Sequence, residues 1–167
     1  MKNVICSILA AIFISASGQA YADVYDVTSY RYISEDALEY ALQGNLSDYA
    51  GHYIYYGKEY GIDPIFLAAK DALESGWGTS YQAVNKNNLS GWTSSDGGAM
   101  YFETPEDCIS HVSYTISDRY IYEPDFNISG YSVYDIGEVY SESEDWAKSV
   151  AEIMYSIEAK VTEYAKN

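Results

Sequence analysis

The stretch DALESGWGTS, residues 71–80, is the most informative part of this sequence. It places Glu74 at the end of an apolar run with helical spacing, directly before two glycines and a tryptophan. Asp63 and Pro64 provide the N-cap and first position of that helix, and Gly76 ends it. A carboxyl group beside an indole at such a bend favours its protonated form, as a general acid requires. We therefore predict that Glu74 ends a helix and faces a cleft.

The first residues have the pattern of an export signal. A basic residue precedes the apolar run 4–14, and a small-residue A-x-A site ends at Ala22. The apolar run is too short to span a bilayer, and no second run of spanning length follows. We expect a signal peptide at 1–22, an N-terminal arm and short helix at 23–45, and a catalytic domain at 46–167. The exported protein would then have no integral membrane segment.

The composition excludes some partners and cofactors. The chain has 167 residues with a formal net charge of −16, which disfavours nucleic acid, because phosphate binding needs clustered Lys and Arg. Its 20 tyrosines offer flat apolar faces that suit sugar rings, although packing is the default role for most of them. Cys108 is the only cysteine after the signal, so no intramolecular disulfide is expected. His52 and His111 lack the paired spacing of a zinc site, and we predict no metal, no cofactor and a monomer.

The pattern along the chain is mostly helical, with one irregular segment. Residues 23–33 look like an extended or loosely attached arm. Glycines and serines at 87–102 separate two short apolar runs, which indicates a β-hairpin. Helices around a cleft with a small β-hairpin lobe form a mainly α (α+β), lysozyme-like fold. Caps and apolar periodicity predict helices at 34–43, 47–60, 64–74, 80–84, 104–120, 132–140 and 143–160.

Several blocks together resemble the family 73 glycoside hydrolases, the bacterial glucosaminidase domain. The main block is ALESGWGTS at 72–80 with NNLSG at 87–91, and the blocks come in the order of that family. The resemblance covers roughly 46–157. Its flanking blocks lie at 60–64, 101–109, 136–140 and 146–150.

The resemblance implies an exported enzyme that cuts the β-1,4 bond on the reducing side of N-acetylglucosamine in peptidoglycan. Carried over by position, Glu74 is the catalytic acid, Tyr140 lies in the cleft near the cleaved bond, and Asn88 shapes the cleft. One departure is Ser90, where the family usually has an aromatic residue. Trp92 is a candidate for the missing ring.

Glycoside cleavage usually needs a second group besides the acid. Glu103 and Asp96 are candidates for a second carboxylate. The alternative, which we favour slightly, is attack by the N-acetyl oxygen of the substrate itself, with Tyr140 orienting it. We expect Asp71, one turn before Glu74, to be an exposed acid paired with Lys70 or solvent.

Sugar binding and overall activity leave alternatives open. Trp77, Trp92 and Tyr101 are candidates to stack on sugar rings, although aromatic residues are as often ordinary core. A muramidase or lytic transglycosylase of the same fold would also use one glutamate. A non-catalytic wall-binding module of a secretion apparatus is the third reading. In each case, the expected partner is the peptidoglycan glycan strand.

Overall fold

The computed structural model describes residues 25–122, 128–141, 143 and 145–167, and the predicted signal peptide lies outside them. Within these residues, no helix has the length and apolar character needed to cross a membrane. The chain is mainly helical, as expected. In order, the elements are α2 (Glu35–Ala41), η1 (Gly44–Tyr49), α3 (Ala50–Tyr60), α4 (Pro64–Ser75), α5 (Tyr81–Lys86), α6 (Pro105–Thr115), η2 (Ile116–Tyr122), α7 (Val133–Tyr140) and α8 (Trp146–Tyr164).

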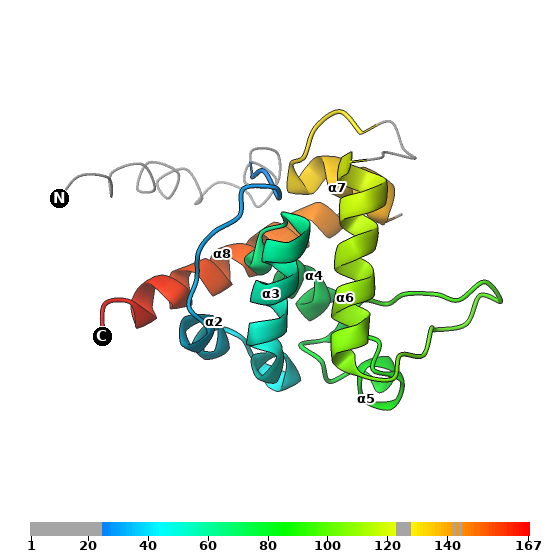
Figure 1. Ribbon diagram of the computed structural model, residues 1–167, viewed down its shortest axis with the longest axis horizontal. Helices are drawn as coiled ribbons and strands as arrows, with labels where there is room; N and C mark the ends of the chain where they lie inside the picture. The colour runs from blue at the N-terminus through cyan, green and yellow to red at the C-terminus, as the bar shows by residue number, and fades with distance from the viewer. Residues whose placement is uncertain (1–24, 123–127, 142, 144) are drawn as a thin grey trace.

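Helix α4 lies at the centre of the fold. Its N-cap Asp63 accepts hydrogen bonds from the backbone N–H groups of Ile65 and Phe66, at 2.7 and 3.3 Å. Its end is set by Gly76, which has φ 56° in the left-handed region. Every residue of 64–72 is buried, and the helix packs against both α3 and α8. In Figure 1, α8 passes behind α3, while α6 stands beside α3.

The segment before α2 is attached to the core. Arg31 forms ion pairs with Asp63 at 2.7 Å and Glu158 at 2.6 Å, and so links the segment to α8. The Tyr25 hydroxyl donates to the same Asp63 carboxylate at 2.6 Å. An isolated bridge also pairs Asp26 with a residue next to α7. The described part of the expected loose arm is therefore held by charged and backbone contacts.

The expected β-hairpin lobe is not seen in the described residues. The segment between α5 and α6, which extends to the right in Figure 1, contains one isolated antiparallel bridge between Thr93 and Ala99. The buried side chain of Asn88 takes up backbone groups that a longer ladder would pair. It donates to the carbonyls of Trp92 and Met100 at 2.7 and 2.9 Å, and accepts from the Trp92 N–H at 3.0 Å. Asn88 thus braces the loop from within, and Lys86 and Asn87 also donate to carbonyls at its far end.

Two predicted helices change character along their length. The helix expected at 47–60 is split into the 3-10 turn η1 and the regular helix α3. The helix expected at 104–120 is regular only through Thr115, and continues as the π-type segment η2. Ser34, Thr104 and Ser132, the first residues of three expected helices, each accept a backbone N–H of the helix that they start.

Candidate active site

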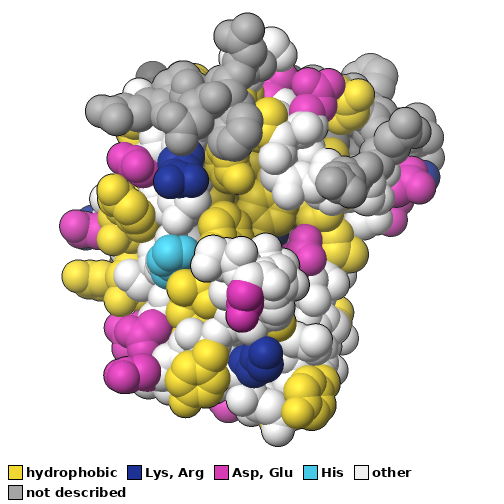
Figure 2. Space-filling model, turned by 90° about the vertical axis from the view of Figure 1, so that its right-hand side faces the viewer, with side chains coloured by type: hydrophobic (Ala, Val, Ile, Leu, Met, Phe, Trp, Pro, Cys, Tyr) yellow, Lys and Arg dark blue, Asp and Glu magenta, His cyan; other side chains and the backbone are white. Residues whose placement is uncertain are grey.

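A cleft of about 450 Å³ lies between the end of α4, the loop after α5 and the end of α7. It opens on the face drawn in Figure 2, where hydrophobic side chains gather toward a central hollow. Its lining brings together residues that are far apart in the sequence: Glu74, Ser90, Gly91, Trp92, Thr93, Tyr120, Tyr140 and Ser141.

Among the described residues, Glu74 is the carboxylate that lines this cleft. It is the penultimate residue of α4 and is partly buried. Its Oε1 atom accepts a hydrogen bond of 2.7 Å from the indole N–H of Trp146, a buried residue that begins α8. Its Oε2 atom lies against Gly91, where an added Cβ would come within 3.1 Å. One carboxylate oxygen is thus held by an indole, and the other lies beside a glycine at the cleft.

Tyr140 lies at the end of α7 and reaches the same cleft. Its ring centroid is 4.9 Å from that of Trp146 and 6.3 Å from that of Trp92. Its hydroxyl donates to the Ser90 carbonyl at 3.3 Å, which is long for an O–H···O hydrogen bond. Burial raises the pKa of this hydroxyl above its usual value, against the opposing effect of the Lys70 charge. Tyr140 is therefore a neutral donor whose proton is only weakly engaged.

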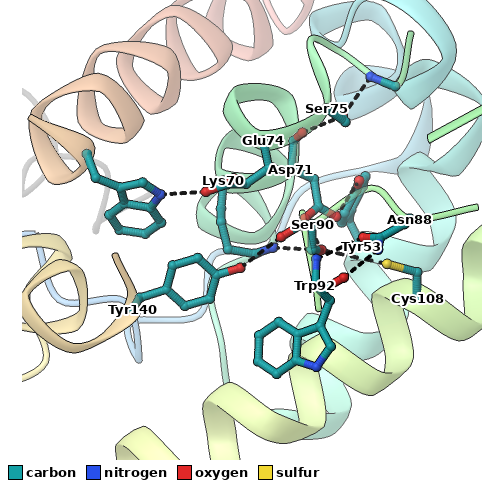
Figure 3. Close-up of polar contacts among 12 residues, drawn as sticks. Tyr53, Lys70, Asp71, Glu74, Ser75, Asn88, Ser90, Trp92, Cys108 and Tyr140 are labelled. Atoms are coloured by element: carbon teal, nitrogen blue, oxygen red, sulfur yellow. Dashed lines mark hydrogen bonds and ion pairs between the residues drawn. The ribbon is translucent and has the colours of Figure 1, made fainter. Parts of the chain in front are cut away.

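A buried polar cluster lies beneath the cleft (Figure 3). Lys70 pairs with Asp71 and donates to the Ser90 hydroxyl at 2.9 Å. Asp71 also accepts from the Ser90 hydroxyl at 2.5 Å and from Tyr53 at 3.0 Å. The Cys108 thiol completes the cluster at 3.8 Å from the Ser90 Oγ. The expected pairing of Asp71 with Lys70 is present, but the expectation that Asp71 is exposed was wrong, because three polar partners compensate its burial.

The charge on Lys70 survives its burial. Burial alone lowers the pKa of an ammonium group, but the negative charge of the adjacent Asp71 carboxylate outweighs this effect. The pKa of Lys70 therefore lies above its ordinary value. A cation is held permanently under the cleft, and its Nζ lies 5.6 Å from the centroid of the Tyr140 ring.

Trp92 is partly buried and forms one wall of the cleft. Its ring packs edge-on against His111 of α6, with centroids 5.7 Å apart. Burial, and then the charge of Arg119, lowers the pKa of His111, so this neighbour is neutral at pH 7. Asn88 does not line the cleft, but its three hydrogen bonds fix the backbone of the loop that carries Trp92.

Four other predicted site residues do not line this cleft. The Trp77 backbone has φ 60°, and its carbonyl accepts from the Asn45 N–H at 3.0 Å. Tyr101 is exposed beyond the loop. Asp96 is exposed in a turn, where it accepts from Ser94 and the Gly98 N–H, and Glu103 is exposed just before α6. The structure thus separates these candidates from Glu74, and their assigned roles stay predictions.

Sequence reasoning missed three contributors to the site: Trp146, Lys70 and Tyr120. Trp146 lies in the helix expected at 143–160 and in the family block at 146–150, but it was given no role in the site. Nothing near it in the sequence indicates a partner 72 positions earlier.

Among the described residues, no group of three His, Cys, Asp or Glu side chains is arranged to hold a metal ion. The expected absence of a metal stays a prediction.

Comparison with known proteins identifies a family and a shared fold. A model of the glucosaminidase family, described as mannosyl-glycoprotein endo-beta-N-acetylglucosaminidase, matches residues 50–159. Among solved structures, S. aureus autolysin E is similar at a TM-score of 0.70 and 19% identity, covering 89% of this chain and 74% of that chain. A catalytic mutant of autolysin E in complex with the disaccharide NAG-NAM gives a TM-score of 0.66 at 18% identity, with 84% and 72% covered. The autolysin E complex with the muropeptide NAM-L-ALA-D-iGLU gives 0.63 at 17% identity, also with 84% and 72% covered. The curated proteins contain no match to this sequence.

Proposed function

This chain belongs to the glucosaminidase family, and we propose that it is a peptidoglycan hydrolase. In this proposal, it is an endo-β-N-acetylglucosaminidase that cleaves the β-1,4 bond after N-acetylglucosamine, with Glu74 as general acid. The observation that carries the proposal is the position of Glu74 in the cleft, with one oxygen bound by Trp146 and the other at the cleft beside Gly91. Complexes of autolysin E with NAG-NAM and with a muropeptide support this substrate class.

The two oxygens of Glu74 would have different tasks. Because Oε1 accepts the Trp146 N–H, the transferable proton sits on Oε2. That proton passes to the glycosidic oxygen as the bond to the anomeric carbon breaks. The carboxylate left behind keeps its hydrogen bond from Trp146, and a hydrogen bond to a charged group is stronger than one to a neutral group. Trp146 thus stabilises the charge that proton transfer creates.

The group that attacks the anomeric carbon is, in our proposal, the acetamide oxygen of the substrate. It forms a bond to that carbon as the leaving sugar departs, and water later opens the cyclic intermediate, with Glu74 taking a proton from the water. The position of Tyr140 supports this route, because its weakly engaged hydroxyl can turn from the Ser90 carbonyl to the acetamide. The configuration at the anomeric carbon would be retained. Glu103 and Asp96 are the alternative second carboxylates.

Aromatic rings around the acid would bind the sugars. Trp92, Tyr120 and Tyr140 line the cleft, and such rings stack well on the apolar faces of pyranoses. The ring of Trp92 stands two positions after Ser90, so it can take the place of an aromatic residue at position 90. We also propose that the chain is exported by the predicted signal peptide, 1–22, and acts on the cell wall as a monomer.

Mass spectrometry of digested peptidoglycan tests the activity. Reducing-end N-acetylglucosamine is the expected product, and it should be missing when Glu74→Gln is used. Reducing N-acetylmuramic acid would indicate a muramidase, and the anhydro form a lytic transglycosylase. A wild-type protein that binds glycan but releases no sugar would instead support a wall-binding module.

A further inference from the structure

We propose that the buried Lys70 is a positioning residue, which holds Tyr140 and the Ser90–Gly91 segment in place from beneath the cleft. This inference rests on the proposed function, because it assigns Lys70 to the same reaction. Lys70 does not touch the substrate in this account. It acts through the two segments that border Glu74.

The first observation is where the ammonium of Lys70 lies. Lys70 is on α4, one helical turn before Glu74, and its side chain is 1% exposed. Its Nζ donates to the Ser90 hydroxyl at 2.9 Å and lies 5.6 Å from the Tyr140 ring centroid. A desolvated cation over an aromatic face attracts the ring strongly. One charged group therefore contacts both the loop after α5 and the end of α7, as Figure 3 shows.

The second observation is that the direction of Lys70 is itself fixed. Asp71 pairs with the ammonium, and its other oxygen accepts from Tyr53 at 3.0 Å. The Ser90 hydroxyl donates to Asp71 while it accepts from Lys70. These shared partners hold the ammonium between Asp71 and Tyr140, so it cannot swing away from the cleft without breaking several buried hydrogen bonds.

The third observation connects these contacts to Glu74. Ser90 leads directly to Gly91, which lies against Glu74 Oε2. Tyr140 packs at 4.9 Å on Trp146, whose N–H binds Glu74 Oε1. A shift of Lys70 would therefore move the groups that contact both carboxylate oxygens of Glu74. Misplacement of a reacting group by about 1 Å can cost about a hundredfold in rate.

Stability alone is a poor reason to bury such a pair. Replacing a buried ion pair with well-packed neutral groups is often neutral or stabilising. The pair in this chain is directed at Tyr140 and Ser90, which line the cleft. A positioning role accounts both for the burial of the Lys70–Asp71 pair and for its contacts with Tyr140 and Ser90.

The test is a cycle of four proteins: wild type, Lys70→Met/Asp71→Asn, Tyr140→Phe and the triple variant. The paired change removes both charges together, and the amide that replaces the Asp71 carboxylate keeps an oxygen that can accept from Tyr53 or Ser90. We expect Tyr140→Phe to lower kcat about a hundredfold and the paired change to lower it about tenfold, with KM nearly unchanged. If Lys70 acts in part through Tyr140, the loss of kcat in the triple variant is smaller than the product of the losses in the two separate variants. Lys58→Met, an exposed change on α3, should leave kcat at the wild-type value.

Each outcome decides one of the two proposals. A paired variant that folds and turns over at the wild-type rate overturns the role of Lys70, as does a triple variant in which the losses multiply. In both of these outcomes the wild-type protein still releases sugar, so the proposed function is unaffected. If the wild type releases no sugar, the proposed function fails. Because the role of Lys70 is defined for that reaction, it fails with the proposed function in this case.

Discussion

The indole N–H of Trp146 donates to Oε1 of Glu74 at 2.7 Å, across 72 positions of sequence. This hydrogen bond joins the first residue of α8 to the last turn of α4. The Trp146 ring also packs against Tyr140, so one buried side chain organises both polar groups of the cleft. It gives the two oxygens of Glu74 different environments, which is what directional proton transfer requires.

Trp146→Phe keeps an aromatic ring against Tyr140 and removes only the N–H and part of the volume. Because a hydrogen bond to a charged group is lost, we expect kcat to fall by about tenfold to a hundredfold. Steady-state kinetics on labelled peptidoglycan measures this. Met154→Leu, a volume-conserving change at a buried position about two turns along α8, controls for altered packing. An unchanged rate in a folded Trp146→Phe protein would remove the indole N–H from the mechanism.

Asn88→Asp tests the bracing of the cleft loop at nearly constant shape. The change replaces the N–H groups that bind the carbonyls of Trp92 and Met100 with an oxygen that repels them. We expect a loss of about 3 kcal/mol in the free energy of unfolding, together with weaker glycan binding through Trp92. Urea denaturation measures the first and calorimetry the second. Asn85→Asp, at an exposed position on α5, should cost little. Equal free energies of unfolding for the two variants would contradict the claim that Asn88 braces the cleft loop.

The buried thiol of Cys108 predicts a loss of stability in alkali. Burial, and then the charge of Asp71, raises its pKa from 9.0 to about 11. Between these values, the folded protein keeps a proton that the unfolded chain has lost. The free energy of unfolding should therefore fall as pH rises, by up to about 1.4 kcal/mol per pH unit. The contribution of the protonated Cys108 thiol to the free energy of unfolding is fully present below pH 9 and is lost as the pH rises to about 11.

Urea denaturation of wild type and Cys108→Ala, at several pH values from 8 to 11, isolates this contribution. The raised pKa values of Tyr53, Lys70 and Tyr140 act in the same direction and persist in the variant. The variant should be less stable at pH 8, because a cavity is left, but its stability should fall less steeply above pH 9. Parallel curves for the two proteins would show that Cys108 does not titrate as described.

Substrate-assisted attack predicts that neither candidate second carboxylate is needed. We expect Glu103→Gln and Asp96→Asn to retain wild-type kcat, because both residues are exposed and neither lines the cleft. Glycan that has been N-deacetylated should not be cleaved, because the attacking acetamide oxygen is missing. Release of reducing ends measures both effects. A loss in either variant as large as that of Glu74→Gln, or cleavage of deacetylated glycan, would point to an enzyme carboxylate.

Features set by neighbouring residues were predictable from the sequence. Helix α4 begins at Pro64 after its Asp63 cap and ends at Gly76, as the local pattern indicates, since caps depend on side chains within a few residues. The position of Glu74 at the helix end followed from the same pattern. Its place beside a cleft depended on more distant parts of the chain, and agrees with the expectation.

Features that depend on distant contacts could not be derived in this way. Asp71 is adjacent to Lys70 in the sequence, but its burial needs Tyr53 and Ser90 from other segments. The indole next to Glu74 in the sequence is Trp77, whereas the indole that binds it belongs to Trp146. Local spacing shows which residues a helix brings near, but the packing of α8 on α4 decides which side chain reaches the acid.

Glu74→Gln gives the most direct test of the central claim, that Glu74 is the general acid of a peptidoglycan hydrolase. The amide keeps the shape and can still accept the Trp146 hydrogen bond, but it cannot donate an acidic proton. We expect the release of reducing ends from purified peptidoglycan to fall by about a thousandfold or more, with an unchanged thermal midpoint. Glu59→Gln, exposed on α3, should match the wild type. A folded Glu74→Gln protein that released reducing ends at the wild-type rate would contradict the claim.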